Sequence, residues 1–302
     1  MPAYPASLSA ALLSRGWLLL SLTSLFWAGN VVAGRLAVGE APPMLITCLR
    51  WLACSTLLLA LNSGQLRREW PLLAPRWRSL LWMGALGFTG YNALFYAAAH
   101  YTTGLNMAII QGAMPVFIVL GSAALGRGVS AAQIAGLVLS TLGVLVVATR
   151  GDLSVLLALA LNRGDLLLLL ACVLYALYVV DLPNRPKVSG LTFFIALSLV
   201  AAGTSVPLMI WEIAAGASFW PTPLGWAVIA YIAVFPSMVA QLCFIRGVEL
   251  VGPSRAGIFT NLVPVLGALL VVLILHEPFG LYHAAALALV MSGLWVTERR
   301  GK

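Results

Sequence analysis

Six amide or hydroxyl side chains lie inside the long apolar stretches of the sequence: Asn30, Asn92, Gln111, Gln241, Thr260 and Asn261. A polar group in an apolar environment is costly unless a hydrogen bond satisfies it. Such groups can bind a ligand, and they can also hold neighbouring helices together. We favour ligand binding in a shared central cavity, because these residues occupy matching places in the two halves of the chain.

Aromatic side chains accompany the polar ones: Trp27, Tyr91, Phe95 and Tyr96 in the first half, and Tyr175, Tyr178 and Phe244 in the second. Asn92, Phe95 and Tyr96 are spaced i, i+3 and i+4, which places them on one face of a helix. An amide combined with aromatic rings suits the planar or apolar side chain of an amino acid. The alternative is a set of aromatic residues that face lipid or the membrane interface.

Two prolines, Pro115 and Pro264, occupy equivalent positions in the middle of apolar stretches. Proline removes a backbone hydrogen bond and can kink a helix. We predict that both act as hinges; the alternative is a role in helix packing alone.

The sequence contains no HExxH or GxSxG motif and no cluster of histidines or paired carboxylates. We therefore predict that the protein is not an enzyme. The four cysteines stand in apolar runs without CxxC spacing, which is typical of small buried side chains. We predict no metal site and no cofactor.

Five carboxylates stand at the ends of the apolar stretches: Asp165, Asp181, Glu212, Glu249 and Glu277. Proton-coupled carriers often keep a titratable acid at mid-membrane, so this arrangement disfavours proton coupling through a buried carboxylate. Arg50 lies about two turns inside the second stretch. We expect it to reach the membrane interface or to pair with Glu40, and the alternative is that it holds a substrate carboxylate.

The elements that position these residues are predicted to be membrane-spanning helices. The chain has 302 residues, of which 62% are apolar and 9% charged, whereas about a quarter of the residues of a soluble domain are charged. Continuous apolar runs of about 20 residues predict helices that cross the bilayer, not strands of a barrel. We predict ten spans: 16–34, 43–61, 77–99, 104–125, 130–148, 164–182, 190–214, 224–250, 253–275 and 280–297.

Positive charges lie at the ends of these spans and in short loops. With the N-terminus inside, 13 of the 17 Lys and Arg residues fall on the cytoplasmic side and 3 on the other. This distribution predicts that both termini are cytoplasmic. The net charge of +8 forms no basic face with interleaved aromatic residues, so we predict no nucleic-acid partner.

The two halves of the chain align with each other at a nearly constant offset. An offset of 149 pairs Asn92 with Gln241 and Pro115 with Pro264, and an offset of 148 pairs Trp27 with Tyr175. We predict two five-helix repeats, 1–150 and 151–302. Because five is odd, the second repeat must enter the membrane from the opposite side, and such inverted repeats bind substrate between them.

Five segments resemble the drug/metabolite transporter superfamily, in particular its EamA-type members. They are SLFWAGN, LRWLACSTLLLA, YNALFYAAAHYTTGLNMAIIQGAMPVF, GDLLLLLACVLYALYVV and the stretch from Gly252 to Gly293, which contains PVLGALLVVLILHEP. Glu277 and Pro278 match the acidic residue and proline that follow the ninth helix in this family. The first half departs from the pattern, because Gly126 and Arg127 stand where many relatives carry an acidic residue. The aromatic-rich third span is similar to that of bacterial aromatic amino-acid exporters.

The resemblance implies an all-helical secondary transporter that exports amino acids, aromatic ones favoured, across a bacterial inner membrane by alternating access. A transporter of another metabolite class, such as nucleosides, drugs or vitamins, is the main alternative. A channel and a membrane-embedded enzyme are less favoured. The expected partners are a small-molecule substrate and the lipid bilayer, and we expect a monomer.

Overall fold

The computed structural model describes residues 15–126, 128–152, 162–252, 256 and 259–299, and every regular element in these ranges is helical. Seven helical stretches there are long and apolar enough to cross a membrane. Two shorter apolar helices, Leu262–Leu275 and Leu281–Val296, accompany them. The described part of the chain is therefore all-helical, with the make-up of a multi-pass membrane protein, while the number of ten spans stays a prediction.

The elements follow the order of the predicted spans. The first half contains α2 (Gly16–Leu36), α3 (Pro43–Leu73), η1 (Ala74–Arg76), α4 (Trp77–Gly84), η2 (Ala85–Gly90), α5 (Tyr91–Ala98), α6 (Gly104–Gly112), α7 (Met114–Ala124) and α8 (Ala131–Ala148). The second half contains α10 (Arg163–Asp181), η3 (Leu182–Asn184), α11 (Gly190–Ala214), α12 (Pro223–Ile232), η4 (Ala233–Val239), α13 (Ala240–Val251), α15 (Leu262–Leu275) and α16 (Leu281–Arg299).

Several predicted helices differ from the observed ones in their continuity. The predicted helix 43–61 continues to Leu73, with a non-helical residue at Asn62 (φ −134°, ψ 18°). The predicted helix 104–125 is broken at Ala113 between α6 and α7, two residues before Pro115. Part of the predicted helix 253–275, namely residues 253–255 and 257–258, lies outside the described residues.

Hydroxyl side chains set the start of four of these helices. Thr103, Ser130, Ser189 and Thr222 each accept a hydrogen bond from the backbone N–H three residues later. Such N-caps satisfy one of the backbone donors that a helix leaves free at its start. The sequence thus fixes where α6, α8, α11 and α12 begin.

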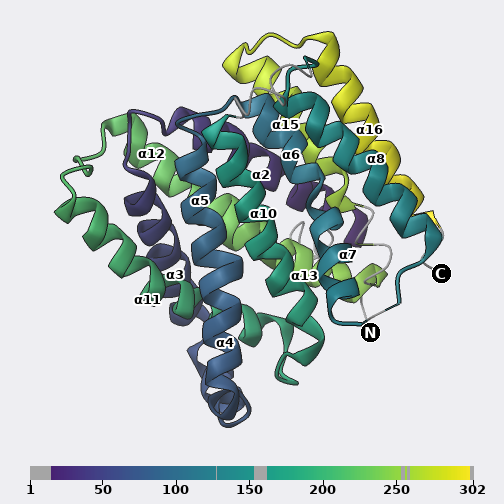
Figure 1. Cartoon of the computed structure of the whole chain (residues 1–302). Helices are drawn as coiled ribbons and strands as arrows, with labels where there is room; N and C mark the ends of the chain where they lie inside the picture. Colours follow the sequence, from purple (N-terminus) through teal and green to yellow (C-terminus); the bar gives the residue numbers. More distant parts are fainter. Residues whose placement is uncertain (1–14, 127, 153–161, 253–255, 257–258, 300–302) are drawn as a thin grey trace, which may run out of the picture.

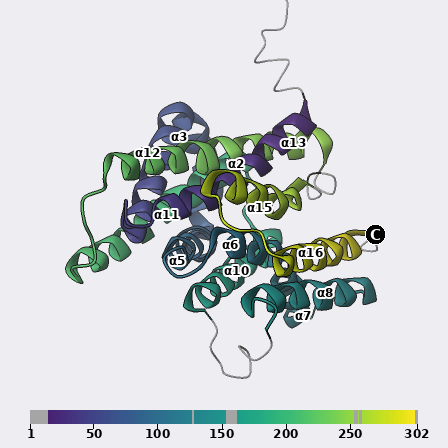
Figure 2. The same cartoon turned by 90° about the horizontal axis from the view of Figure 1, so that it is seen from above.

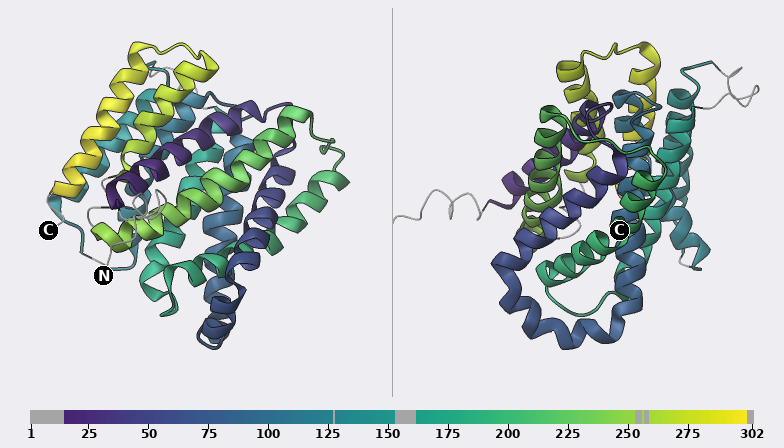
Figure 3. Two further views of the ribbon diagram at one scale, coloured as in Figure 1. Left: turned by 180° about the vertical axis from the view of Figure 1, so that it is seen from behind. Right: turned by 90° about the vertical axis from the view of Figure 1, so that its left-hand side faces the viewer.

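The helices pack into a single bundle in which partners far apart in sequence lie side by side. α8 packs against α16 at one side of the bundle, and α3 packs against α11 at the opposite side (Figure 1, Figure 2). α2 contacts both α13 and α15, and α10 contacts α5 and α7. Beyond Asn62 the chain turns beneath the bundle through η1 into α4 (Figure 3).

The outer surface of the bundle carries large apolar side chains. Leu281, Trp220 and Leu61 are 90%, 81% and 74% exposed. Many large apolar side chains on the outside of a helical bundle are suited to lipid and not to water. The interior holds two clusters of buried apolar residues, one around Phe95 and Ile109 and one around Trp51 and Phe194.

Candidate functional site

A buried polar network centred on Arg50 of α3 lies between the two apolar clusters. Its Nε donates a hydrogen bond to Ser237 Oγ at 2.9 Å, and its Nη1 donates to Asn92 Oδ1 at 2.5 Å and to the Tyr96 hydroxyl. Tyr96 in turn donates to Asn30 Oδ1 at 2.8 Å. All five side chains are buried. They come from α2, α3, α5 and η4, so the network joins elements of both halves of the chain.

The guanidinium of Arg50 carries the only charge in this network. Moving such an ion out of water costs several kcal/mol. The hydrogen bonds, each worth about 1.5–3 kcal/mol to a charged donor, offset much of that cost. The Trp51 ring, whose centroid lies 4.9 Å from Arg50 Cζ, adds about 2 kcal/mol as a cation–π partner. None of these groups is an anion, so the positive charge itself stays uncompensated within the network.

Two π-helical segments position the network. η2 runs directly into α5, which carries Asn92, and η4 runs directly into α13, which carries Gln241. Segments of this type are frequent at functional sites because they interrupt the regular helical hydrogen bonds. Ser237 lies within η4, and its hydroxyl donates to Ile232 O five residues earlier at 2.7 Å.

The two π segments differ in length by one residue. η2 has 6 residues and η4 has 7. At an offset of 148 Thr89 aligns with Ser237, whereas Asn92 aligns with Gln241 at 149. The extra residue of η4 therefore lies where the offset between the two halves changes.

Most of the predicted aromatic residues form a second group beside the network. The Tyr91 ring lies 5.9 Å from that of Phe95 and 5.3 Å from that of Tyr175, and Tyr175 lies 5.4 Å from Tyr178, centroid to centroid. The Tyr91 hydroxyl donates to Gln111 Oε1 at 2.9 Å. Phe95 also contacts the Tyr96 ring at 5.2 Å, so the aromatic group and the polar network are continuous.

Trp27 and Phe244 form a third group, in which α2 contacts η4 and α13. Their ring centroids lie 5.3 Å apart, and Trp27 Nε1 donates to the backbone carbonyl of Pro236 at 3.2 Å. Gln241 lies half-buried on α13, one turn before Phe244. These contacts bring a first-half aromatic residue against the second half.

The two prolines predicted as hinges lie at interrupted helices. Pro115 follows the break between α6 and α7, and Pro264 lies in the first turn of α15. The two regions pack together, since a Cβ at Gly112 would lie 3.0 Å from Pro264 Cβ. Thr260 and Asn261, predicted to bind substrate, are half-buried immediately before α15.

The expected pairing of Arg50 with Glu40 is wrong. Glu40 accepts a hydrogen bond from the Thr222 hydroxyl, and its backbone carbonyl accepts one from Thr222 N at 3.0 Å. Arg50 is 4% exposed and does not reach the interface. The physical reason is that the bundle offers hydroxyl and amide acceptors beside Arg50, and Ser237 among them is 187 positions away in sequence.

Two of the carboxylates at helix ends bind donors of neighbouring helices. Glu212 accepts from Met44 N and Leu45 N, both at 3.0 Å. Asp165, although only 2% exposed, lies in the first turn of α10 and accepts from Asn106 Nδ2 at 3.2 Å. These contacts identify both groups as ties between helix ends.

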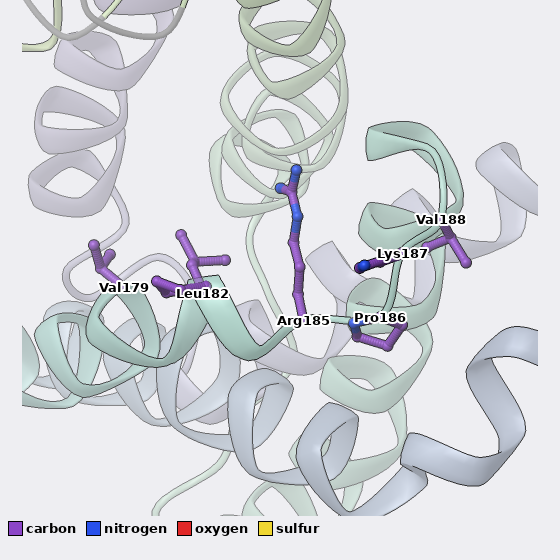
Figure 4. A pocket seen from close by; sticks show the side chains of 7 residues that line it. Val179, Leu182, Arg185, Pro186, Lys187 and Val188 are labelled. Atoms are coloured by element: carbon purple, nitrogen blue, oxygen red, sulfur yellow. The ribbon is translucent and has the colours of Figure 1, made fainter.

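A pocket of about 460 Å³ opens at the loop between α10 and α11, away from the network. It is lined by Val179, Leu182, Pro183, Arg185, Pro186, Lys187 and Val188. Figure 4 shows Val179 and Leu182 coming from the end of α10 and η3, while Arg185 extends from the loop. None of the predicted binding residues lines this pocket, so we base the candidate site on the network.

The prediction from sequence missed Ser237 and favoured another role for Arg50. A single arginine inside an apolar stretch was the available signal for Arg50. Ser237 carried a weaker signal, its alignment with Thr89, because one serine in an apolar stretch is unremarkable in a membrane helix.

Comparison with known proteins identifies a family. Residues 14–149 and 162–299 each match the sequence profile of the EamA-like transporter family. The uncharacterized transporter YetK of Bacillus subtilis is 28% identical over 278 residues, which cover 90% of this chain and 83% of that protein. The uncharacterized transporter YyaM of the same organism is 28% identical over 72% of this chain and 71% of its own length.

Two further likenesses concern location and fold. The uncharacterized inner membrane transporter YedA of Escherichia coli K12 is 25% identical over 82% of this chain and 78% of that protein. One protein of known crystal structure matches with a TM-score of 0.63 at 20% identity, over 95% of this chain and 99% of that one. At this identity the structural match shows a shared fold only.

Proposed function

The chain belongs to the EamA-like transporter family, and from this premise we propose that it is a secondary transporter that exports amino acids, with aromatic amino acids favoured. The observation that carries the proposal is the buried polar network next to an aromatic group. Asn30, Asn92 and Tyr96 offer donors and acceptors to the polar backbone atoms of an amino acid. Tyr91 and Tyr175 offer rings to its side chain.

We further propose that residues 1–150 and 151–302 form two inverted five-helix repeats that alternate access to a site between them. Two separate matches to one family profile support this division. The π segments η2 and η4 at matching places in the two halves support it as well. The broken α6–α7 stretch gives a point where one repeat can bend during the change of access.

The same proposal includes the location of the protein. We propose a monomer in a bacterial inner membrane with both termini cytoplasmic, and the distribution of Lys and Arg residues supports this side for the termini. The printed description of YedA as an inner membrane transporter is consistent with this location.

A counterflow assay with purified full-length protein tests the substrate. Proteoliposomes loaded with unlabelled phenylalanine are expected to accumulate labelled phenylalanine, tryptophan and tyrosine well above protein-free liposomes. The panel includes a nucleoside, a vitamin and a drug cation. The flux is expected to saturate with substrate, as it does for a carrier.

Two results would contradict the substrate assignment. Counterflow of a nucleoside or vitamin without any amino-acid counterflow would contradict the assignment of amino acids as substrates. It would not affect the assignment of the chain to its transporter family. Flux that rises in proportion to concentration would indicate a channel instead of a carrier.

A further inference from the structure

We propose that Arg50, together with the indole N–H of Trp51, binds a carboxylate group of the transported solute. The proposal deepens the proposed function, because it names the charged group that the substrate must carry. It rests on the chain being a transporter, but it does not require the substrate to be an amino acid.

The hydrogen bonds of Arg50 leave part of its guanidinium available. A guanidinium has five N–H donors. Nε donates to Ser237, and Nη1 donates to Asn92 and Tyr96. The two N–H groups of Nη2 have no acceptor among the described residues. Nη2 can therefore donate a charge-assisted hydrogen bond to a carboxylate oxygen of a solute, in addition to the attraction between the two charges.

Trp51 supplies a second open donor next to Arg50. Its side chain is 3% exposed, and its buried Nε1 has no hydrogen-bond partner among the described residues. The ring centroid lies 4.9 Å from Arg50 Cζ. Buried donors without acceptors are rare in folded proteins, and the ring that carries this one lies beside the Arg50 guanidinium.

No carboxylate of the described chain neutralises Arg50. The ion pairs found in the described ranges involve Arg35 with Glu277 and Arg246 with Glu249. Glu212 and Asp165, the most buried acids there, bind Met44, Leu45, Thr102 and Asn106 instead. Arg50 therefore has no counter-charge within the described chain, and an anionic solute can supply one.

The fold does not need a cation at this position for packing. At the offset of 148, Arg50 corresponds to Ser198 of α11, which is fully buried and donates to Ile195 O at 2.8 Å. The equivalent helix in the second half thus packs with a small neutral side chain. Arg50 therefore has no cationic counterpart at the aligned position of the second half, as expected for a group that binds one end of an asymmetric solute.

Binding of matched acid and amide pairs to the purified full-length protein tests the proposal. The pairs are L-phenylalanine with L-phenylalaninamide, 3-phenylpropionate with 3-phenylpropionamide, and nicotinate with nicotinamide, measured by calorimetry in detergent. In the wild type, at least one acid is expected to bind about ten-fold or more tightly than its amide, as a charge-assisted hydrogen bond implies. Wild-type protein that prefers no acid over its amide overturns the proposal.

Variants assign that preference to Arg50. In Arg50→Gln the ratio of acid to amide affinity is expected to fall to about one, whereas Arg50→Lys keeps part of it because the charge remains. Arg78→Gln is the matched control, since Arg78 also lies over an adjacent tryptophan, Trp77, but is exposed. Should Arg50→Gln fail to fold, Arg50→Lys decides: a ratio equal to the wild-type ratio overturns the proposal.

The outcomes separate this proposal from the proposed function. Preference for 3-phenylpropionate or nicotinate over their amides, without counterflow of any amino acid, supports the carboxylate site and removes amino-acid export. Amino-acid counterflow with equal affinity for phenylalanine and its amide supports amino-acid export and removes the carboxylate site.

Discussion

At the scale of single residues, one asparagine links the polar network to the π segment that precedes it. Asn92 accepts from Arg50 Nη1 and donates through Nδ2 to Phe88 O at 2.5 Å. Both contacts hold the amide in one orientation. If the network binds substrate, the loss of this amide affects transport more than it affects folding.

We predict that Asn92→Ala lowers counterflow by about ten-fold or more, because a hydrogen bond to a charged group is worth about 1.5–3 kcal/mol. Asn62→Ala is the control. Its Nδ2 also donates to the carbonyl four residues earlier, Leu58 O at 3.2 Å, but it contacts no charged group of the network. Equal activity of the two variants would show that the network is structural only.

The sequence predicted part of this site for a clear physical reason. Asn30, Asn92 and Tyr96 stand out as polar groups in apolar stretches, and the structure joins them. The partnership of Arg50 with Ser237 depends on the packing of α3 against η4. No local pattern encodes that contact.

At the scale of elements, glycines allow α8 and α16 to approach closely. A Cβ at Gly293 would lie 2.6 Å from the backbone carbonyl oxygen of Gly136, and one at Gly143 would lie 2.8 Å from that of Ala286. Small residues at helix contacts are the usual means of close packing in membranes. At an offset of 150 Gly143 aligns with Gly293, but only the packing shows that each faces the other helix.

We predict that Gly293→Ala destabilises the protein by about 1–3 kcal/mol, because the added methyl group meets backbone atoms that cannot move aside. Gly203→Ala in α11 is the control, since its Cβ would meet no atom within 4 Å. That variant is expected to be neutral or stabilised by up to about 1 kcal/mol. Thermal unfolding of both purified proteins measures the difference, and equal melting temperatures would contradict the close packing.

Helix boundaries were predictable where caps or proline mark them. Thr103, Ser130 and Thr222 start helices at the expected places, and Pro115 marks the break after α6. The continuation of α3 to Leu73 was not predictable from hydropathy, because residues 62–69 are mainly polar or charged.

At the scale of the whole molecule, carboxylates tie helix ends together on the side predicted to be non-cytoplasmic. Glu277, after α15, accepts from Gly104 N at 2.8 Å and Leu105 N at 3.0 Å, and lies 3.6 Å from Arg35 Nε. Arg35 also donates to the carbonyl of Ala99. This one carboxylate therefore connects α2, the end of α5, the start of α6 and the end of α15.

An alternating-access cycle requires these ties to break when the non-cytoplasmic side opens. Glu277→Gln removes the negative charge that holds Arg35 and two backbone donors, at a cost of about 1–3 kcal/mol to the tied state. We predict that the open population rises about ten-fold or more. With spin labels at Val38 and Phe279, in a background without the native cysteines, the distribution of distances between the two labels is expected to shift toward longer values in Glu277→Gln than in the wild type.

Glu249→Gln is the matched control for this experiment. It removes the Arg246–Glu249 pair, whose side chains are 50% and 55% exposed, and exposed pairs contribute about 0–1 kcal/mol. Its distance distribution is expected to equal that of the wild type. If Glu277→Gln also leaves the distribution unchanged, the tie does not govern opening, and the two halves must separate along another contact, such as that between α3 and α11 where Glu212 binds Met44 and Leu45.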